Sequence, residues 1–329
     1  MLAGFLSEIK PQESNICISC CIPYNLDILR SRFPEVNWYP YTTEARESCI
    51  NSCDVWLGLG GSPFQSSVSS WFIDHLAEEH RIASKFHKPM AFLGIGSQDD
   101  NAFNNSVLTH IMQSSNFISA RDFSTYKALL NIRIDHKKIY LGADLSHLFF
   151  SRNLAQFAHK GRLTMVLNSD YKSWPNLNSL VSDLSQLRAD EQIWLIQESR
   201  PLPGSEQDLY QCLSLDVKAK WTPVFAEKTN EPLSNILTKW PTGEWTLTSR
   251  YHACLTSLWG GSKTTVLALN GKLKAVASEF GLAALPMDAS NDAIITALRT
   301  SKPVDRSILT KHTKLAKDSV THFRATFGL

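Results

Sequence analysis

Short apolar runs of strand length alternate with helical segments along most of this chain of 329 residues. Helical periodicity marks Leu26–Phe33 and Thr125–Leu130, and a longer helix follows Gly61. The strands predicted in the first half are Ile16–Ile22, Asp54–Leu59, Pro89–Gly94, Asn116–Ala120 and Lys138–Leu141. Alternation at this spacing predicts βαβ units, in which helices cover both faces of a parallel sheet.

The pattern starts again after the polar stretch Phe149–Gly161, which is therefore the predicted domain boundary. The second set of predicted strands is Leu163–Leu167, Gln192–Ile196, Trp245–Ser249 and Thr265–Leu269, with a helix predicted over Tyr210–Leu215 among those between them. We predict an α/β fold with two Rossmann-like domains over 1–150 and 160–305. An amphipathic helix over 306–329 should pack back on the body.

The composition of the chain limits which binding partners and which cellular compartment we expect. The net charge of +2 gives no single-sign field of the kind that holds DNA phosphates, so we expect no nucleic acid partner. No apolar run approaches the roughly 20 residues that span a bilayer, and the N-terminus does not resemble a secretory signal. The odd count of seven cysteines includes Cys17 and Cys20 at CxxC spacing, with no second pair to complete a zinc site. We expect reduced cysteines, no metal and a cytoplasmic location.

Two glycine runs stand where strands end. They are Gly58-Leu-Gly-Gly-Ser-Pro63 and Gly94-Ile-Gly-Ser97. Glycine lets a backbone approach a ligand and exposes amide groups at the next helix N-terminus, and ligands of open α/β sheets bind at this edge. Neither run is a GxGxxG or Walker A motif, and a tight turn is the alternative. The loop candidates are Gly60, Gly61, Ser62 and Gly96.

A third strand end carries Arg121 and Asp122 in the segment Ile118-Ser-Ala-Arg-Asp-Phe-Ser124. Asp122 or Ser124 is suited to cap the following helix, which would place Arg121 at the ligand-binding edge. The alternative is an Arg–Asp pair that only holds the turn.

The strongest candidate site is the segment Leu247-Thr-Ser-Arg-Tyr-His-Ala-Cys254. Arg250 and His252 lie where a predicted strand enters a helix, whose first turn carries the positive end of the helix dipole. Arginine binds phosphate or carboxylate through two parallel hydrogen bonds, and histidine exchanges a proton near neutral pH. If the backbone stays extended, residues two apart face the same ligand. The pair predicts an anion site with an acid–base group beside it; a structural histidine is the alternative.

These segments together resemble the polysaccharide pyruvyl transferases. That family has Ser-x-Arg-x-His-Ala, matched by Ser249, Arg250, His252 and Ala253, and followed here by Gly260-Gly261, Lys272 and Gly281-Leu282. The matching upstream segments are Asp54–Gly61, Lys88–Gly96, Ile118–Ser124 and Gly142–Asp144. Collinear order over roughly residues 50–285 makes the resemblance more specific than any one motif. The chain departs from the family at Ile22–Asp27, Lys263 and Leu269.

The resemblance implies a glycosyltransferase-B-like architecture with an acceptor-side N-terminal domain and a donor-side C-terminal domain. Phosphoenolpyruvate would be the donor, and a pyruvate ketal on two sugar hydroxyls the product, with phosphate released. Arg121, Arg250 and Lys272 would hold anionic charge, and His252 would act as general acid or base. We expect no cofactor beyond the substrate. The acceptor would be a saccharide of open identity, and a lipid-linked one would bring peripheral contact at the inner face of the plasma membrane.

Two other functions fit the same features. A nucleotide-sugar-dependent glycosyltransferase of this architecture could use the same cations for a diphosphate, because fold does not fix function. A non-catalytic sugar-binding protein is the third hypothesis, and the joint presence of Arg121, Arg250, His252 and Lys272 argues against it. The cleft predicted between the domains would be lined by Gly60, Arg121, Arg250 and His252.

Overall fold

The computed structural model describes residues 1–14, 16–22, 26–61, 71–97, 102–154, 158–168, 177–187, 189–197, 205–225, 232–286 and 288–329. The described chain divides into two compact units. The first unit comprises Met1–Arg152, Asn230–Leu233 and Leu309–Leu329; the second comprises Asn153–Thr229 and Ser234–Ile308. The main division after Arg152 lies inside the predicted boundary segment, and the C-terminal residues belong to the first unit.

The first unit contains a parallel sheet in the order β3-β4-β5-β6 and a separate parallel pair, β1 with β2. The strands are β1 (Ile18–Ile22), β2 (Val36–Pro40), β3 (Trp56–Leu59), β4 (Met90–Ile95), β5 (Phe117–Ala120) and β6 (Ile139–Leu141). The helices are α1 (Leu2–Ile9), α2 (Pro11–Ser14), α3 (Leu26–Arg32), α4 (Thr43–Ser52), α5 (Trp71–Lys85), α6 (Ser106–Ser114), α7 (Phe123–Leu130), α8 (Ser146–Asn153) and, from residue 309 on, α16 (Arg306–Phe327).

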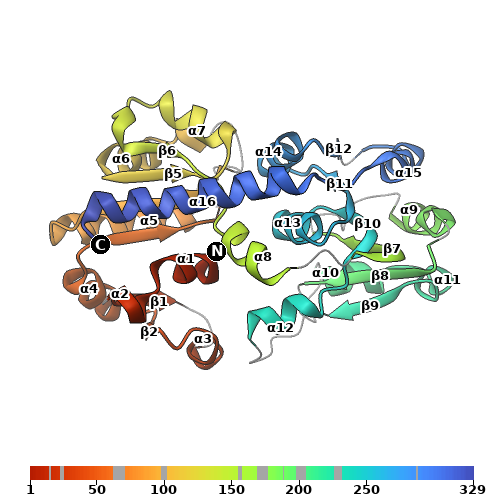
Figure 1. The fold of residues 1–329 in the computed structure, drawn as a ribbon, viewed down its shortest axis with the longest axis horizontal. Coiled ribbons are helices and arrows are strands. Elements are labelled where there is room, and N and C mark those ends of the chain that lie inside the picture. Colours follow the sequence, from red (N-terminus) through yellow and green to blue (C-terminus); the bar gives the residue numbers. More distant parts are fainter. Residues whose placement is uncertain are drawn as a thin grey trace. The chain divides into compact units, whose positions relative to one another are not determined.

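The C-terminal helix α16 completes the core of the first unit. Its buried Val320 and Phe323 pack with Phe5 of α1 and Phe117 of β5, and Figure 1 shows α16, in blue, lying along this unit. The hydroxyl of Ser119 donates to that of Ser319 at 2.8 Å, across 200 residues of sequence. The apolar side of this amphipathic helix therefore packs on one face of the sheet β3-β4-β5-β6.

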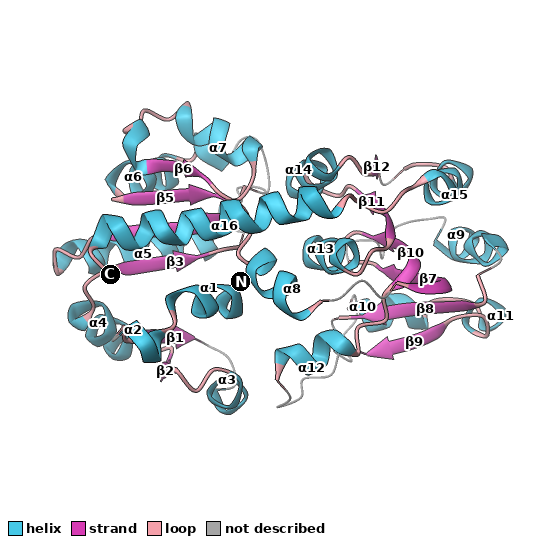
Figure 2. Cartoon of the chain, viewed as in Figure 1, coloured by secondary structure: helices cyan, strands magenta, loops and turns pink. Residues whose placement is uncertain are grey.

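The second unit has one parallel sheet in the order β12-β11-β10-β7-β8-β9. Its strands are β7 (His159–Val166), β8 (Glu191–Ile196), β9 (Thr222–Phe225), β10 (Gly243–Thr248), β11 (Lys263–Leu267) and β12 (Ala283–Leu285). Its helices are α9 (Leu177–Leu184), α10 (Glu206–Gln211), α11 (Leu215–Lys218), α12 (Leu233–Thr238), α13 (Tyr251–Trp259), α14 (Gly271–Phe280) and α15 (Asn291–Thr300). Figure 2 shows the neighbouring arrows of β8 and β9 pointing the same way. The strand order of this second sheet reverses between β10 and β7, which makes it doubly wound. Parallel sheets in both units confirm the predicted Rossmann-like α/β fold.

Residues at its two ends explain where helix α14 begins and ends. The side chain of Asn270 accepts a hydrogen bond from the Leu273 N–H and so begins α14, and Gly281 ends that helix at φ 64°. Glycine reaches this left-handed conformation without a Cβ penalty. The predicted helix over Tyr210–Leu215 is wrong, because α10 ends at Gln211 and Ser214 stands before the short α11.

Candidate functional site

Two neighbouring strands of the second unit, β7 and β10, bring their carboxyl ends together at the Arg-x-His segment. The hydroxyl of Ser249, after β10, accepts from the backbone N–H of Asn168, after β7, at 2.7 Å. The Ser249 N–H donates to the Val166 carbonyl at 3.0 Å, and the Arg250 N–H donates to the Thr248 hydroxyl at 3.0 Å. These bonds fix the backbone from which the Arg250 side chain projects.

The guanidinium of Arg250 is held by the carboxylate of Glu206, at the start of α10. Arg250 Nε donates to Glu206 Oε1 at 2.6 Å, and Nη2 donates to the same oxygen. Glu206 is completely buried, whereas the Arg250 side chain is 30% exposed. An arginine that is partly exposed and already held by one carboxylate is preorganised to bind a second anion.

His252 is exposed in the first turn of α13. Its ring lies edge-on to that of Tyr251, with centroids 5.3 Å apart. Because α13 begins at Tyr251 and Arg250 is its N-cap residue, the backbone is extended at Arg250 only. The expectation that strand alternation points Arg250 and His252 the same way is therefore wrong in its premise, although both side chains belong to one strand–helix junction.

Lys272 follows the next strand of the same sheet. It lies in the first turn of α14, after β11, and β11 pairs with β10 in parallel. The carboxyl ends of parallel strands share one edge of a sheet, so Arg250, His252 and Lys272 all lie at that edge of the second unit. This is the grouping expected of a site for a multiply charged anion.

Arg121 is buried in the first unit and paired with carboxylates. Its side chain is 1% exposed, with Nε 3.5 Å from Asp122 Oδ2 and Nη1 3.6 Å from Asp144 Oδ2. Asp122 also caps α7 by accepting from the Thr125 N–H at 2.8 Å. A Cβ at Gly96 would collide with the Arg121 guanidinium, so glycine makes room for it. The Arg–Asp pair of the structural alternative is thus present, and anion binding by Arg121 stays a prediction.

The two glycine loops of the first unit are hydrogen-bonded to each other. The Gly96 N–H donates to the Gly61 carbonyl at 3.0 Å. Gly60 and Gly61 have φ of 62° and 82°, a conformation that favours glycine. The Met1 Sδ accepts from the Gly61 N–H at 3.0 Å and lies where a Cβ of Gly60 would stand. Ser62 lies outside the described residues.

Sequence reasoning missed a buried histidine pair beside Asp144. The rings of His147 and His312 are tilted against each other with centroids 5.3 Å apart, and both side chains are buried. Burial, with a smaller effect of the Lys311 charge, lowers the pKa of His312 to about 4. The available signal for His147 was its position three residues after Asp144, which ends the matching segment Gly142–Asp144. Nothing in the local pattern marks His312. That Arg121 and Gly60 share one cleft with Arg250 and His252 stays a prediction.

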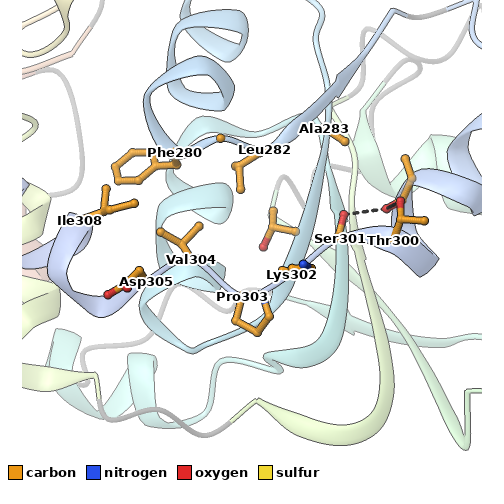
Figure 3. Close-up of a pocket in the computed structure, with 13 residues that line it drawn as sticks. Phe280, Leu282, Ala283, Thr300, Ser301, Lys302, Pro303, Val304, Asp305 and Ile308 are labelled. Carbon is orange, nitrogen blue, oxygen red and sulfur yellow. Dashed lines mark hydrogen bonds between the residues drawn. The ribbon is translucent and has the colours of Figure 1, made fainter.

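A cavity of about 400 Å³ lies at the opposite end of the second unit's sheet (Figure 3). Thr264, near the start of β11, and Ala283, at the start of β12, line it together with the segment Thr300–Asp305. Arg250 follows the carboxyl end of β10, which runs parallel to β11, so this cavity is separate from the candidate site.

Within the described ranges, no three His, Cys, Asp or Glu side chains come together as a possible metal site. The expectation of no metal stays a prediction. Nor is any helix in this part of the chain long and apolar enough to cross a membrane.

The sequence comparison decides the family. Residues 5–261 match the family model described as polysaccharide pyruvyl transferase, which is most of the chain. The chain belongs to the polysaccharide pyruvyl transferase family. It is accordingly a transferase enzyme, as predicted. The match includes Arg121, Arg250 and His252 and ends before Lys272. None of the curated proteins compared with the chain matches it.

Solved structures with a similar fold belong to other enzymes. UDP-GlcNAc 2-epimerase from Methanocaldococcus jannaschii is 14% identical, with a TM-score of 0.65 over 98% of this chain and 96% of that one. MnaA from S. aureus, solved with UDP, is 10% identical, with a TM-score of 0.64 over 100% and 93%. MurG from Acinetobacter baumannii is 11% identical, with a TM-score of 0.53 over 99% and 94%. At these identities the likeness shows the fold alone, which is the glycosyltransferase-B-like architecture.

Proposed function

We propose that this pyruvyl transferase uses phosphoenolpyruvate as donor and forms a pyruvate ketal on two hydroxyls of a saccharide. The observation that carries the proposal is the gathering of Arg250, His252 and Lys272 at one edge of the second unit's sheet, in a chain of this family. Phosphoenolpyruvate carries a phosphate and a carboxylate, and each suits an arginine fork or a lysine ammonium.

The reaction needs one proton delivered to carbon and two hydroxyl additions. A first sugar hydroxyl loses its proton and bonds to the central carbon of the donor, while the methylene carbon takes a proton and becomes methyl. Cleavage of the carbon–oxygen bond to phosphate releases phosphate with its electron pair. A second hydroxyl then bonds to the same carbon and loses its proton, which closes the ketal.

In this scheme His252 transfers the proton that reaches the methylene carbon. Arg250 and Lys272 stabilise the donor and the departing phosphate. The exposure of His252 lets a substrate reach its ring. Arg121 of the first unit is the other proposed anion-binding cation, although Asp122 and Asp144 already pair with its guanidinium and offset its charge. The proposal needs no cofactor.

The test is phosphate release from phosphoenolpyruvate in the presence of lipid-linked, nucleotide-linked and polymeric saccharides. We expect release with one acceptor class, a mass gain on that acceptor equal to the ketal, and loss of both in His252→Gln. Release without any acceptor-dependent product, or with equal rates in His252→Gln, would contradict the proposal.

A nucleotide-sugar glycosyltransferase is the second candidate, because some similar structures hold uridine nucleotides. These are MnaA from S. aureus with UDP and HepE from Anabaena with UDP-glucose, the latter at a TM-score of 0.55 and 9% identity. Titration separates the two candidates: phosphoenolpyruvate binding that UDP does not displace supports pyruvyl transfer, whereas tight UDP binding alone supports glycosyl transfer. A chain that binds neither would support the non-catalytic hypothesis.

The proposed location is the cytoplasm, with peripheral contact at the inner face of the plasma membrane where the acceptor is lipid-linked. All seven cysteines are free thiols, which is usual for proteins of a reducing compartment. Fractionation that finds the protein released by high salt would support peripheral contact, and a requirement for detergent would contradict it.

A further inference from the structure

The carboxylate of Glu206 uses both of its oxygens inside the second unit. Oε1 accepts from Nε and Nη2 of Arg250, and Oε2 accepts from the backbone N–H of Gln197 at 2.7 Å. Ser205 precedes it as the N-cap residue of α10 and accepts from the Asp208 N–H. Glu206 therefore ties the loop after β8 to the strand–helix junction after β10.

Burying this carboxylate is costly unless its partners compensate. An ionised carboxyl group removed from water loses its favourable solvation, which only a cation and further hydrogen bonds recover. Glu206 is 0% exposed, and Arg250 supplies that cation. A surface ion pair that merely stabilised the fold would need no such burial, and an apolar pair would serve a core equally well.

The geometry selects one edge of the guanidinium. Glu206 contacts the edge formed by Nε and Nη2. A phosphate or carboxylate of the donor would bind the exposed part of the guanidinium, in the plane that Glu206 sets. Because Glu206 is enclosed, an arriving anion does not contact its carboxylate directly.

We infer that Glu206 is a positioning residue for donor binding, which fixes the guanidinium plane of Arg250 before the donor arrives. The inference rests on the proposed function only for the identity of that donor. Because the folded protein already orders the Arg250 side chain, donor binding does not have to supply the free energy for that ordering. Loss of Glu206 should therefore weaken donor affinity.

The experiment combines Glu206→Ala and Glu206→Gln with Arg250→Ala. Calorimetric titration gives the Kd for phosphoenolpyruvate, and phosphate release gives kcat and the KM of each substrate. We expect Glu206→Ala to raise the donor Kd about 10-fold, since contacting residues commonly couple by this much, with the acceptor KM unchanged. In the Arg250→Ala background, Glu206→Ala should have no further effect on the donor Kd.

Glu206→Gln tests orientation against charge and covers the case in which the alanine variant does not fold. A glutamine has one oxygen, so its NH2 group faces either the Gln197 N–H, where one bond is lost, or the guanidinium, where two are lost. Because the remaining oxygen still accepts from the other partner, we expect a smaller rise in the donor Kd, about threefold. The matched control is Glu244→Gln. Glu244 lies near the amino end of β10 and pairs with Lys263 at 2.8 Å, and this change should leave the donor Kd as in wild type.

Three results would overturn the inference: tighter donor binding in both Glu206 variants, an unchanged donor Kd in both, or a Glu206→Ala effect that persists without Arg250. Failure of the proposed function looks different. If wild type does not bind phosphoenolpyruvate, the same variants are titrated with inorganic phosphate, and loss of phosphate affinity through Arg250 supports the positioning role alone. Wild type that binds neither anion contradicts both.

Discussion

Arg250 combines a strong charge with a restrained geometry, and the two can be separated by substitution. Lysine keeps the positive charge but lacks the planar fork that donates to Glu206 and would also donate to an anion. We expect Arg250→Lys to weaken donor binding by about 1–3 kcal/mol, as measured by titration. Arg162→Lys, at the other end of the sheet in β7, is the control and should bind donor normally. Equal affinity in both variants would refute the anion-fork role.

His252 differs from Arg250 in exposure, and its expected effect differs accordingly. Because its side chain is exposed, His252→Gln should leave the melting temperature within the range of surface substitutions. If the ring transfers the proton, turnover should fall by about 10²–10⁴-fold with little change in donor Kd. Unfolding of this variant would instead show that the histidine is structural.

At the scale of elements, α16 carries the clearest pH dependence. Burial lowers the pKa of His312 to about 4 from its ordinary value of 6.5, so the folded protein binds fewer protons than the unfolded chain between these two pH values. Stability contributed by the neutral ring is therefore complete above pH 6.5 and declines as the pH falls toward 4, by at most about 3 kcal/mol. Urea unfolding at pH 7, 5.5 and 4 measures this decline. His312→Gln should flatten it, whereas the exposed His136→Gln should not.

The elements also show what the sequence could and could not predict. The ends of α14 depend on signals that lie in its own sequence, because Asn270 and Gly281 act through local backbone geometry. The short strand β2 was missed, since Val36-Asn-Trp-Tyr-Pro40 becomes a strand by pairing with β1. Glu206 was missed for a related reason: an acidic residue in a first helical turn is usually solvated, and its burial depends on Arg250, 44 residues away. Partners distant in sequence leave no local pattern.

At the scale of the whole molecule, the two units have separate hydrophobic cores. Leu180 of α9 is completely buried in the core of the second unit. Leu180→Ala should lower the free energy of unfolding by about 2–5 kcal/mol. Hydrogen exchange should become faster in β7, β8 and β10, and stay unchanged in β3–β6, if each unit opens on its own. Faster exchange in both sheets would show that the units unfold as one.

The division of α16 between the units also fixes the order in which the cores can form during translation. Residues 309–329 belong to the first unit, and Val320 and Phe323 fill part of its core. A nascent chain that has emerged from the ribosome as far as Ile308 therefore holds every segment of the second unit, while the first still lacks its last helix. The apolar surface around Phe5 and Phe117 then stays open until residues 309–329 have emerged as well. N-terminal domains generally fold first during synthesis; here the C-terminal unit is the first that can finish.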